Sequence, residues 1–280
     1  MGLRIAFIGY GEVGQLFSHS LAVKPDVWIS VYDILFDDAR RGPGLRQQAQ
    51  ENDIYAAASI GEACERADIV ISAVTADAAV AVAKQAAPFL KAGQIYVDLN
   101  SVSPATKSEV DASVSRADAD FVEFAVMAPV SDPGIAVPIL SGGKRAEEIS
   151  SRLNALGMKV TPVSIEIGTA SATKLCRSIV IKGMEALMVD FTLASQKADV
   201  MPAVLASLKA SYPGMEWENM AKIMMSRVRR HGIRRAAEMR EASRMMTEMR
   251  LDGSLANAIA DRHESFAQGS DEPYDTVKEG

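Results

Sequence analysis

The sequence predicts an α/β protein, with an N-terminal, doubly wound, largely parallel sheet followed by an all-α C-terminal domain. Three observations support this fold class. Short, almost continuously apolar runs alternate with helical patterns up to about residue 165, which is typical of a parallel sheet covered on both faces. A glycine-rich turn follows the first apolar run. Strand patterns then stop, so the 280 residues are predicted to form two domains, 1–165 and 166–280.

Each element has its own local signal. Predicted strands are apolar runs bounded by turn residues, and they cover residues 5–8, 27–33, 69–74, 95–101, 120–130, 136–143 and 159–164. The intervening helices have recognisable ends, such as Pro104 in one first turn and Gly157 as one stop. The second domain is predicted to contain helices over 170–197, 201–208, 216–230, 233–249 and 253–265, before a polar tail that should fray.

Composition and charge exclude several classes of function. The net charge of −6 is unfavourable for a nucleic-acid partner. Residues 227–235 are a local exception with five arginines; we interpret them as a solvated helix face, with an anion or cofactor contact as the alternative. No apolar run is long enough for a signal peptide or a membrane helix. The two cysteines form no disulfide or metal-ligand pattern, which favours a reduced, cytoplasmic setting without a metal.

The strongest motif is GYGEVG at residues 9–14, a Gly-x-Gly-x-x-Gly pattern between an apolar strand and a helix. In this context Gly9 permits the tight turn, Gly11 lets backbone N–H groups approach a pyrophosphate, and Gly14 lets the helix pack close to the strand. The helix N-terminus adds free N–H groups and partial positive charge. A plain tight turn is the alternative. The predicted cofactor-binding residues here are Gly9, Tyr10, Gly11, Glu12, Val13 and Gly14.

Asp33 is predicted to bind the adenosine ribose. It ends the second strand 19 residues after Gly14, where a carboxylate can accept hydrogen bonds from ribose hydroxyls and would repel a 2′-phosphate. Asp33 therefore favours NAD over NADP. Arg40 and Arg41 follow in the next loop and weaken that preference.

Loops after two later strands are predicted to complete the cofactor site. Ligands of doubly wound sheets bind at the carboxyl ends of the strands, and Val74, Thr75 and Asn100 follow such strands. The alternative is that these loops are routine turns in which Thr75 or Ser103 caps the next helix.

Four segments occur in an order that resembles the β-hydroxyacid dehydrogenases. They are the glycine motif, DLNSVSPAT at 98–106, FVEFAVMAPV with GIAVPILSGG within 121–143, and GTASATKLCRS at 168–178. This family includes 3-hydroxyisobutyrate and tartronate semialdehyde reductases and 6-phosphogluconate dehydrogenase. The resemblance covers residues 3–190 and implies an NAD(P)-binding Rossmann domain followed by a helical substrate and dimerisation domain. The remainder resembles a shorter branch that also carries an arginine-rich RRAAEMRE segment.

The resemblance assigns a catalytic role to Lys174. Family members read Gly-x-Gly-x-x-x-Lys-x-x-Asn-Asn or Lys-x-x-His-Asn at this point. Gly168 and Ala170 stand at the two glycine positions and Lys174 at the lysine position. Arg177 and Ser178 replace the final pair, so Ser178 is predicted to donate a hydrogen bond to a substrate oxygen.

The resemblance also implies a segment, Asp-x-Pro-Val-Ser-Gly-Gly, that binds a substrate carboxylate. By spacing along residues 121–143, Met127 replaces its serine, whereas by literal match of APVS the serine is Ser131. We adopt Met127 as substrate-binding and keep Ser131 as the alternative. Ser101 is predicted to orient the substrate. The glutamate that assists decarboxylation in phosphogluconate enzymes falls at Ile181, which argues against that reaction.

Helix geometry and proton chemistry support the same lysine. Ser171, Lys174, Ser178 and Glu185 follow i, i+3, i+7 and i+14 and share one helix face. Hydride transfer requires a group that takes or gives the proton of the substrate oxygen. A lysine does this if burial or a cationic neighbour lowers its pKa. The alternative is a solvent-facing lysine.

The sequence therefore predicts a cytoplasmic NAD(P)-dependent dehydrogenase that acts on CH–OH donors such as small hydroxy acids. Two alternatives stay open: an imine reductase of the same architecture, which generally has Asp or Tyr at the lysine position, and a non-catalytic NAD(P)-binding protein. A homodimer is predicted because helices rich in Met and Ala over 166–280 cannot easily bury their own surface. His231 and Arg234 are further candidates for a site role.

Overall fold

The computed structural model describes residues 2–269 and divides the chain into two compact units, with the boundary between Lys174 and Leu175. The first unit contains an eight-stranded sheet, and the second is helical. The predicted fold class, an α/β sheet domain followed by an all-α part, is confirmed. Nearly all of the polar tail that was expected to fray lies outside the described residues.

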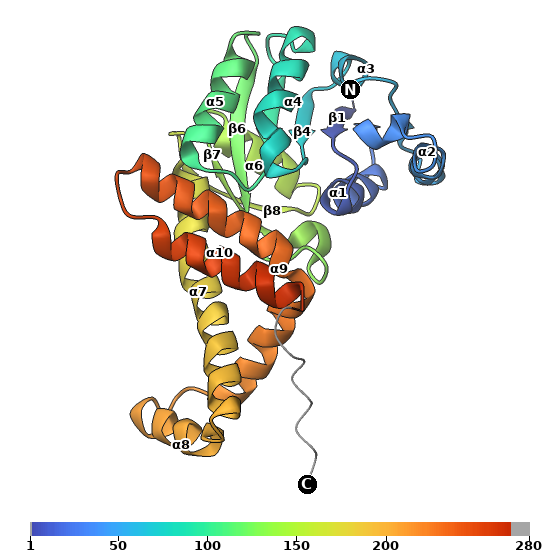
Figure 1. The fold of residues 1–280 in the computed structure, drawn as a ribbon. Coiled ribbons are helices and arrows are strands. Elements are labelled where there is room, and N and C mark those ends of the chain that lie inside the picture. The colour runs from blue at the N-terminus through green and yellow to red at the C-terminus, as the bar shows by residue number, and fades with distance from the viewer. Residues whose placement is uncertain (1, 270–280) are drawn as a thin grey trace. The chain divides into compact units, whose positions relative to one another are not determined.

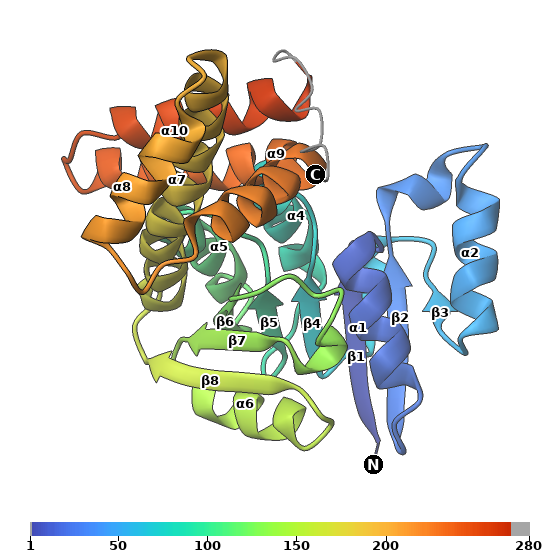
Figure 2. The same ribbon diagram turned by 90° about the horizontal axis from the view of Figure 1, so that it is seen from below.

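The sheet has the strand order β3-β2-β1-β4-β5-β6-β7-β8 and is parallel except that β7 runs antiparallel to β6 (Figure 2). The order reverses between β1 and β4, which is the switch point of a doubly wound sheet. Ile8, Ser72 and Asp98 are register partners, so β1, β4 and β5 end level with one another. The strands are β1 Leu3–Ile8, β2 Val27–Tyr32, β3 Tyr55–Ala56, β4 Ile69–Ser72, β5 Ile95–Asp98, β6 Asp120–Val126, β7 Pro138–Gly142 and β8 Lys159–Ser164.

Helices cover both faces of the sheet because successive strand residues point to opposite sides. Ile5 and Phe7 of β1 join the core beneath α1, α2 and α6, whereas Ala6 and Ile8 join the core beneath α3, α4 and α5. These helices are α1 Glu12–Ala22, α2 Gly42–Glu51, α3 Ile60–Glu65, α4 Ala79–Ala86, α5 Pro104–Ser115 and α6 Ala146–Asn154. The sequence did not predict α2 or β3: α2 is mostly polar and buries only Gly42 and Ala49, and β3 is a strand of two residues.

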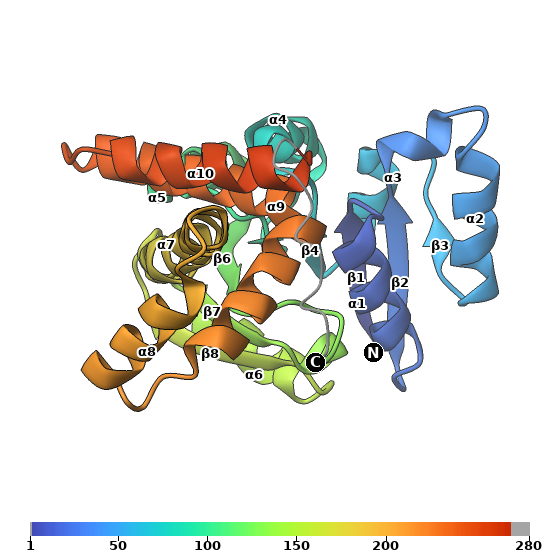
Figure 3. The same ribbon diagram turned by 60° about the horizontal axis from the view of Figure 1, so that its bottom comes forward.

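Up to Gly269, the second unit is formed by the helices α7, α8, α9 and α10 (Figure 1). Val189 of α7, Met225 and Val228 of α9, and Phe266 of α10 form one of its buried apolar clusters, and α9 and α10 pack along each other (Figure 3). No helix in the part of the chain that the structure describes is long and apolar enough to cross a membrane. The helices are α7 Thr169–Lys197, which begins in the first unit, α8 Met201–Ser211, α9 Trp217–Glu248 and α10 Ser254–Ala267.

One helix of this unit corrects the sequence prediction. Separate helices were predicted over 216–230 and 233–249, but α9 runs unbroken from Trp217 to Glu248. Gly232 lies in the gap between the two predicted helices. A Cβ on Gly232 would lie 2.3 Å from the His263 carbonyl oxygen of α10. The glycine therefore permits close packing of the two helices and does not end either of them.

Candidate functional site

The glycine turn joins β1 to α1, and each glycine in it has its own structural reason. Gly9 has a φ of +104°, which favours glycine, and a Cβ there would lie 2.3 Å from the Ala73 carbonyl oxygen. A Cβ on Gly14 would lie 2.1 Å from the Gly9 carbonyl oxygen. A Cβ on Gly11 would meet nothing within 4 Å. Open space therefore lies beside the first N–H groups of α1, where a pyrophosphate fits.

Asp33 fastens the glycine turn to the end of β2. Its Oδ2 accepts a hydrogen bond from the Tyr10 N–H at 2.6 Å, and its Oδ1 accepts one from the Leu35 N–H at 2.8 Å. The second bond caps the 3₁₀ helix Ile34–Asp37. A carboxylate oxygen can accept more than one hydrogen bond, so these contacts are compatible with the predicted bonds to a ribose.

Tyr10 contributes its backbone to the turn, because its side chain is buried elsewhere. The ring packs edge-on against Phe36, and the hydroxyl lies 2.6 Å from His19 Nε2. Burial raises the pKa of the Tyr10 hydroxyl to about 12 and lowers the pKa of His19. Glu12 is exposed in the first turn of α1 and Val13 is half-buried. The predicted pyrophosphate contacts of these residues therefore depend on their backbone N–H groups.

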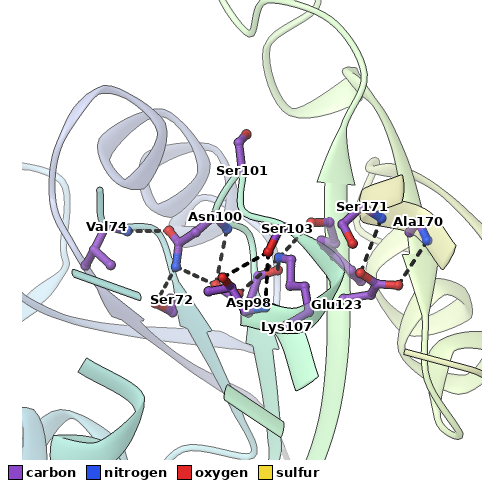
Figure 4. A network of polar contacts seen from close by, with 12 residues as sticks. Ser72, Val74, Asp98, Asn100, Ser101, Ser103, Lys107, Glu123, Ala170 and Ser171 are labelled. Carbon is purple, nitrogen blue, oxygen red and sulfur yellow. Dashed lines mark hydrogen bonds and ion pairs between the residues drawn. The ribbon is translucent and has the colours of Figure 1, made fainter. Parts of the chain in front are cut away.

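Asn100 connects the loops that follow β4 and β5 (Figure 4). Its Oδ1 accepts a hydrogen bond from the Val74 N–H at 2.8 Å. Its Nδ2 donates to Ser72 Oγ at 3.1 Å and also to Asp98 Oδ1. An amide nitrogen has two hydrogens, and both are used here. The predicted cofactor residues Val74 and Asn100 are thus bonded directly to each other, and the Asn100 amide has a fixed orientation.

A buried ion pair lies beneath the loop after β5. Lys107 of α5 is fully buried, and its Nζ lies 3.0 Å from Asp98 Oδ2. The same ammonium donates to the carbonyl oxygens of Asp98 at 2.8 Å and Phe124 at 3.4 Å. Lys107 is not among the site residues predicted from the sequence. Its signal was the spacing i, i+3, i+7 with Val110 and Val114, which places Lys107 on the buried face of α5.

A second buried carboxylate fixes the start of α7. Glu123 of β6 is fully buried and accepts hydrogen bonds from the N–H groups of Gly168, Ala170 and Ser171 at 2.7, 3.0 and 3.3 Å (Figure 4). Its negative charge complements the positive end of the helix dipole. Gly142 is its register partner in β7, and a Cβ there would lie 2.7 Å from Glu123 Oε1. The glycine therefore makes room for this carboxylate.

Lys174 belongs to the same unit as this helix start, and its Nζ donates a hydrogen bond to Ser101 Oγ. Both side chains are half-buried. Ser101 directly follows Asn100, so the predicted lysine contacts the loop after β5. The arrangement combines an ammonium donor with a hydroxyl at the edge of the sheet where ligands of this fold bind.

Residues 4–164 match the family described as the NAD binding domain of 6-phosphogluconate dehydrogenase. The chain belongs to this family. Residues 195–266 match a second family, described as a domain of unknown function, DUF1932. A conserved hypothetical protein from Sinorhizobium meliloti 1021 is similar over the whole chain, with 35% identity, 93% of its own length covered and a TM-score of 0.85.

Solved structures of related architecture include dehydrogenases. The conserved protein MTH1747, described as structurally similar to 3-hydroxyacid dehydrogenases, shares 28% identity over 96% of this chain and 98% of its own, with a TM-score of 0.77. Mycobacterium tuberculosis 3-hydroxyisobutyrate dehydrogenase shares the fold, with 16% identity over 96% and 94% of the two chains and a TM-score of 0.77. An imine reductase from Myxococcus stipitatus shares it at a TM-score of 0.58, with 18% identity over 95% of each chain. The chain therefore has an NAD-binding dehydrogenase fold.

The other predicted residues of this NAD-binding unit lie in loops. Thr75 is exposed and makes no side-chain cap, whereas Ser103 caps α5. Met127 is half-buried immediately after β6, and Ser131 is exposed in the loop between β6 and β7. These positions leave both registers of the carboxylate-binding segment open.

The helical unit holds the remaining candidates. Ser178 is buried and accepts a hydrogen bond from Lys182 Nζ at 3.2 Å, and this ammonium lies 2.7 Å from Glu238 Oε2. His231 and Arg234 are exposed on α9. Glu238 was not predicted as a site residue, because its partner Lys182 comes from another helix.

Proposed function

We propose that the chain is an NAD(P)-dependent oxidoreductase that transfers hydride between the nicotinamide and a small hydroxy acid or a related alcohol or carbonyl compound. Lys174 is the general acid and base of this reaction. The observation that carries the proposal is the hydrogen bond from Lys174 Nζ to Ser101 Oγ at the carboxyl end of β5. The glycine turn supports it, since the open space at Gly11 suits a pyrophosphate.

Each residue of the proposed site has its own role in the reaction. When bound, the nicotinamide supplies or accepts the hydride. In the reducing direction the Lys174 ammonium gives a proton to the substrate oxygen, and in the oxidising direction the neutral amine takes it back. The Ser101 hydroxyl orients the ammonium and can donate to or accept from the same substrate oxygen. Ser178, one helical turn after Lys174, is proposed to bind the substrate.

The test is an absorbance assay of the reduced nicotinamide with hydroxy acids, amino alcohols and sugar acids, run with NAD and with NADP. Replacing Lys174 by Ala should lower kcat by about 100-fold or more and leave the dissociation constant of the dinucleotide within about twofold. Lys144, exposed in the same unit, provides the matched control, and Lys144→Ala should leave kcat unchanged. Unchanged turnover in Lys174→Ala would remove the lysine from the mechanism.

The same assay separates the alternatives. Turnover of cyclic imines, with none of hydroxy acids, would identify an imine reductase. Dinucleotide binding without turnover of any substrate class would identify a non-catalytic binding protein. For the dinucleotide, Asp33 favours NAD, and Arg41 is engaged with Asp38 at 3.3 Å, so we expect the lower KM with NAD.

The chain is proposed to act as a homodimer assembled through its helical unit. No residue of α8 is buried, although Val204, Leu205 and Leu208 give it an apolar face. Val180 and Leu187 of α7 are 59% and 65% exposed. Burying such surfaces in a symmetric dimer removes apolar area from water. Light scattering should give twice the chain mass, and Leu205→Glu should shift the population towards monomer.

A further inference from the structure

The buried ion pair of Lys107 and Asp98 has no direct path to a ligand. The Lys107 ammonium has three hydrogens, and three oxygens accept from it, two from Asp98 and one from Phe124. Its exposed fraction is 0%. Any effect of this lysine on ligand binding must therefore be transmitted through its partners, and of these Asp98 is the one that contacts the loop after β5.

Asp98 transmits the effect to Asn100. With Oδ2 occupied by Lys107, Asp98 turns Oδ1 towards the Asn100 side chain and its backbone N–H, which lies 3.2 Å away. Asn100 then holds the Val74 N–H and Ser72 Oγ. Each of these contacts restricts the next, because both hydrogens of the Asn100 amide and both carboxylate oxygens of Asp98 are engaged within the network (Figure 4).

We propose that the Lys107–Asp98 pair is a positioning device for the nicotinamide half of the dinucleotide site. The inference rests on the proposed function. The pair orients the Asn100 amide, and Asn100 fixes the Val74 backbone after β4 and the start of the Ser101 loop after β5. Lys107 and Asp98 are thus positioning residues, and neither touches substrate or cofactor.

The topology limits the effect to one half of the ligand. In a doubly wound sheet the two mononucleotide halves of a dinucleotide bind on opposite sides of the switch point. Asp33 and the glycine turn belong to β1 and β2, on the adenosine side, whereas the network joins β4, β5 and α5. A purely structural ion pair would have no such preference between the halves.

ADP-ribose contains the adenosine half of the dinucleotide without the nicotinamide. Its binding distinguishes a positioning role of the ion pair from a purely structural one. The measurement is the dissociation constant of NAD and of ADP-ribose by calorimetry. If the chain binds NADP more tightly than NAD, the two ligands are NADP and ADP-ribose 2′-phosphate. Lys107→Met keeps an unbranched side chain only one atom shorter and removes the charge. It should weaken NAD binding by about tenfold, the equivalent of one hydrogen-bonded charge. ADP-ribose binding should stay within about twofold.

A matched control is available in the same unit. Lys84 of α4 pairs with Glu109 of α5 at 2.8 Å, but both side chains are 56% exposed. Lys84→Met should change neither dissociation constant. Asp98→Asn combined with Lys107→Met removes both charges, and an amide at position 98 still offers Asn100 one acceptor. This double variant should recover part of the lost NAD affinity.

Equal losses for NAD and ADP-ribose, or no loss for either, would overturn the positioning role. If Lys107→Met fails to fold, the double variant is used to test the positioning role. Its loss of affinity for NAD is then compared with its loss of affinity for ADP-ribose. NAD binding that is sensitive to Lys107 in a protein without turnover would overturn the proposed reaction and leave the positioning role intact. A wild-type chain that binds no dinucleotide would overturn both.

Discussion

Both units bury charged side chains, but they satisfy those charges differently. In the sheet unit, Lys107 reaches two backbone carbonyl oxygens besides the Asp98 carboxylate. In the helical unit, Glu185 is fully buried with Oε2 2.8 Å from Arg235 Nη1, yet its Oε1 has no hydrogen-bond partner among residues 2–269. His263 is also fully buried, and its Nδ1 has no partner within the same range.

The secondary structure explains the contrast. The carboxyl ends of strands and the loops after them leave backbone carbonyls available, whereas helix interiors use theirs in hydrogen bonds four residues along the chain. Charges buried between helices therefore depend mostly on other side chains, although His263 Nε2 also lies 3.0 Å from the Lys182 carbonyl oxygen. Burial raises the pKa of Glu185 and lowers the pKa of His263. The sheet unit uses its buried charges to hold one geometry, and the helical unit keeps groups whose charge responds to pH.

The largest expected effect concerns Glu123 of the sheet unit, whose carboxylate accepts hydrogen bonds from backbone N–H groups. Glu123→Ala leaves the three N–H groups at the start of α7 without their acceptor. The free energy of unfolding should fall by about 4 kcal/mol, as measured by denaturant titration. Glu148 provides the control, because it is 45% exposed and pairs with Arg145; Glu148→Ala should cost less than about 1 kcal/mol. Equal losses of unfolding free energy in Glu123→Ala and Glu148→Ala would contradict the stabilising role of the backbone N–H groups.

Replacing each buried pair by apolar residues tests the comparison directly. Asp98→Leu with Lys107→Met should cost about 3 kcal/mol, because the Asn100 amide and the buried carbonyl oxygens lose their partners. Glu185→Leu with Arg235→Met should change stability by less than about 1 kcal/mol, because it also removes the Oε1 that lacks a partner in the described part of the chain. Urea unfolding of both double variants measures the difference. A larger loss in the helical unit would reverse our interpretation.

Most elements of the sheet unit could be predicted from the sequence, because the apolar runs and turn residues that mark them locally also match where those elements are buried or end. The run at 69–74 became β4, Ile69–Ser72, and Pro104 became the first residue of α5. The break predicted near residue 232 was wrong because the reason for Gly232 is the carbonyl oxygen of His263, on a different helix. No window of sequence around Gly232 contains that information.

The candidate site was predictable where one residue type is required by backbone geometry. The positive φ of Gly9 and the close approach at Gly14 are such cases. Lys107 and Glu123 were missed because their partners are mostly backbone N–H and carbonyl groups, which any residue type supplies. Their only signal is a charged residue at an apolar position. The assignments of Lys174, Ser101 and Asp33 to catalysis, substrate and cofactor stay predictions.

The smallest expected effect concerns the pH dependence of the helical unit. Burial, together with the charges of Arg235 and Lys182, lowers the pKa of His263, against the opposing influence of the Lys182 carbonyl and Glu238. The unfolded chain therefore binds a proton at His263 that the folded chain does not, as the pH falls through the ordinary histidine pKa of about 6.5. This group makes stability decrease with falling pH until its folded pKa is passed.

Glu185 is expected to change stability with pH in the opposite direction to His263, so the two substitutions should have opposite effects. Because its folded pKa is raised, the folded chain binds the extra proton as the pH falls towards the ordinary glutamate value, and stability increases. His263→Asn should therefore flatten the loss of stability between about pH 7 and pH 5, and Glu185→Gln should steepen it. Urea titrations at several pH values measure both slopes. If neither substitution changes its slope, folding does not change the proton binding of Glu185 or His263, and our interpretation of the helical unit is wrong.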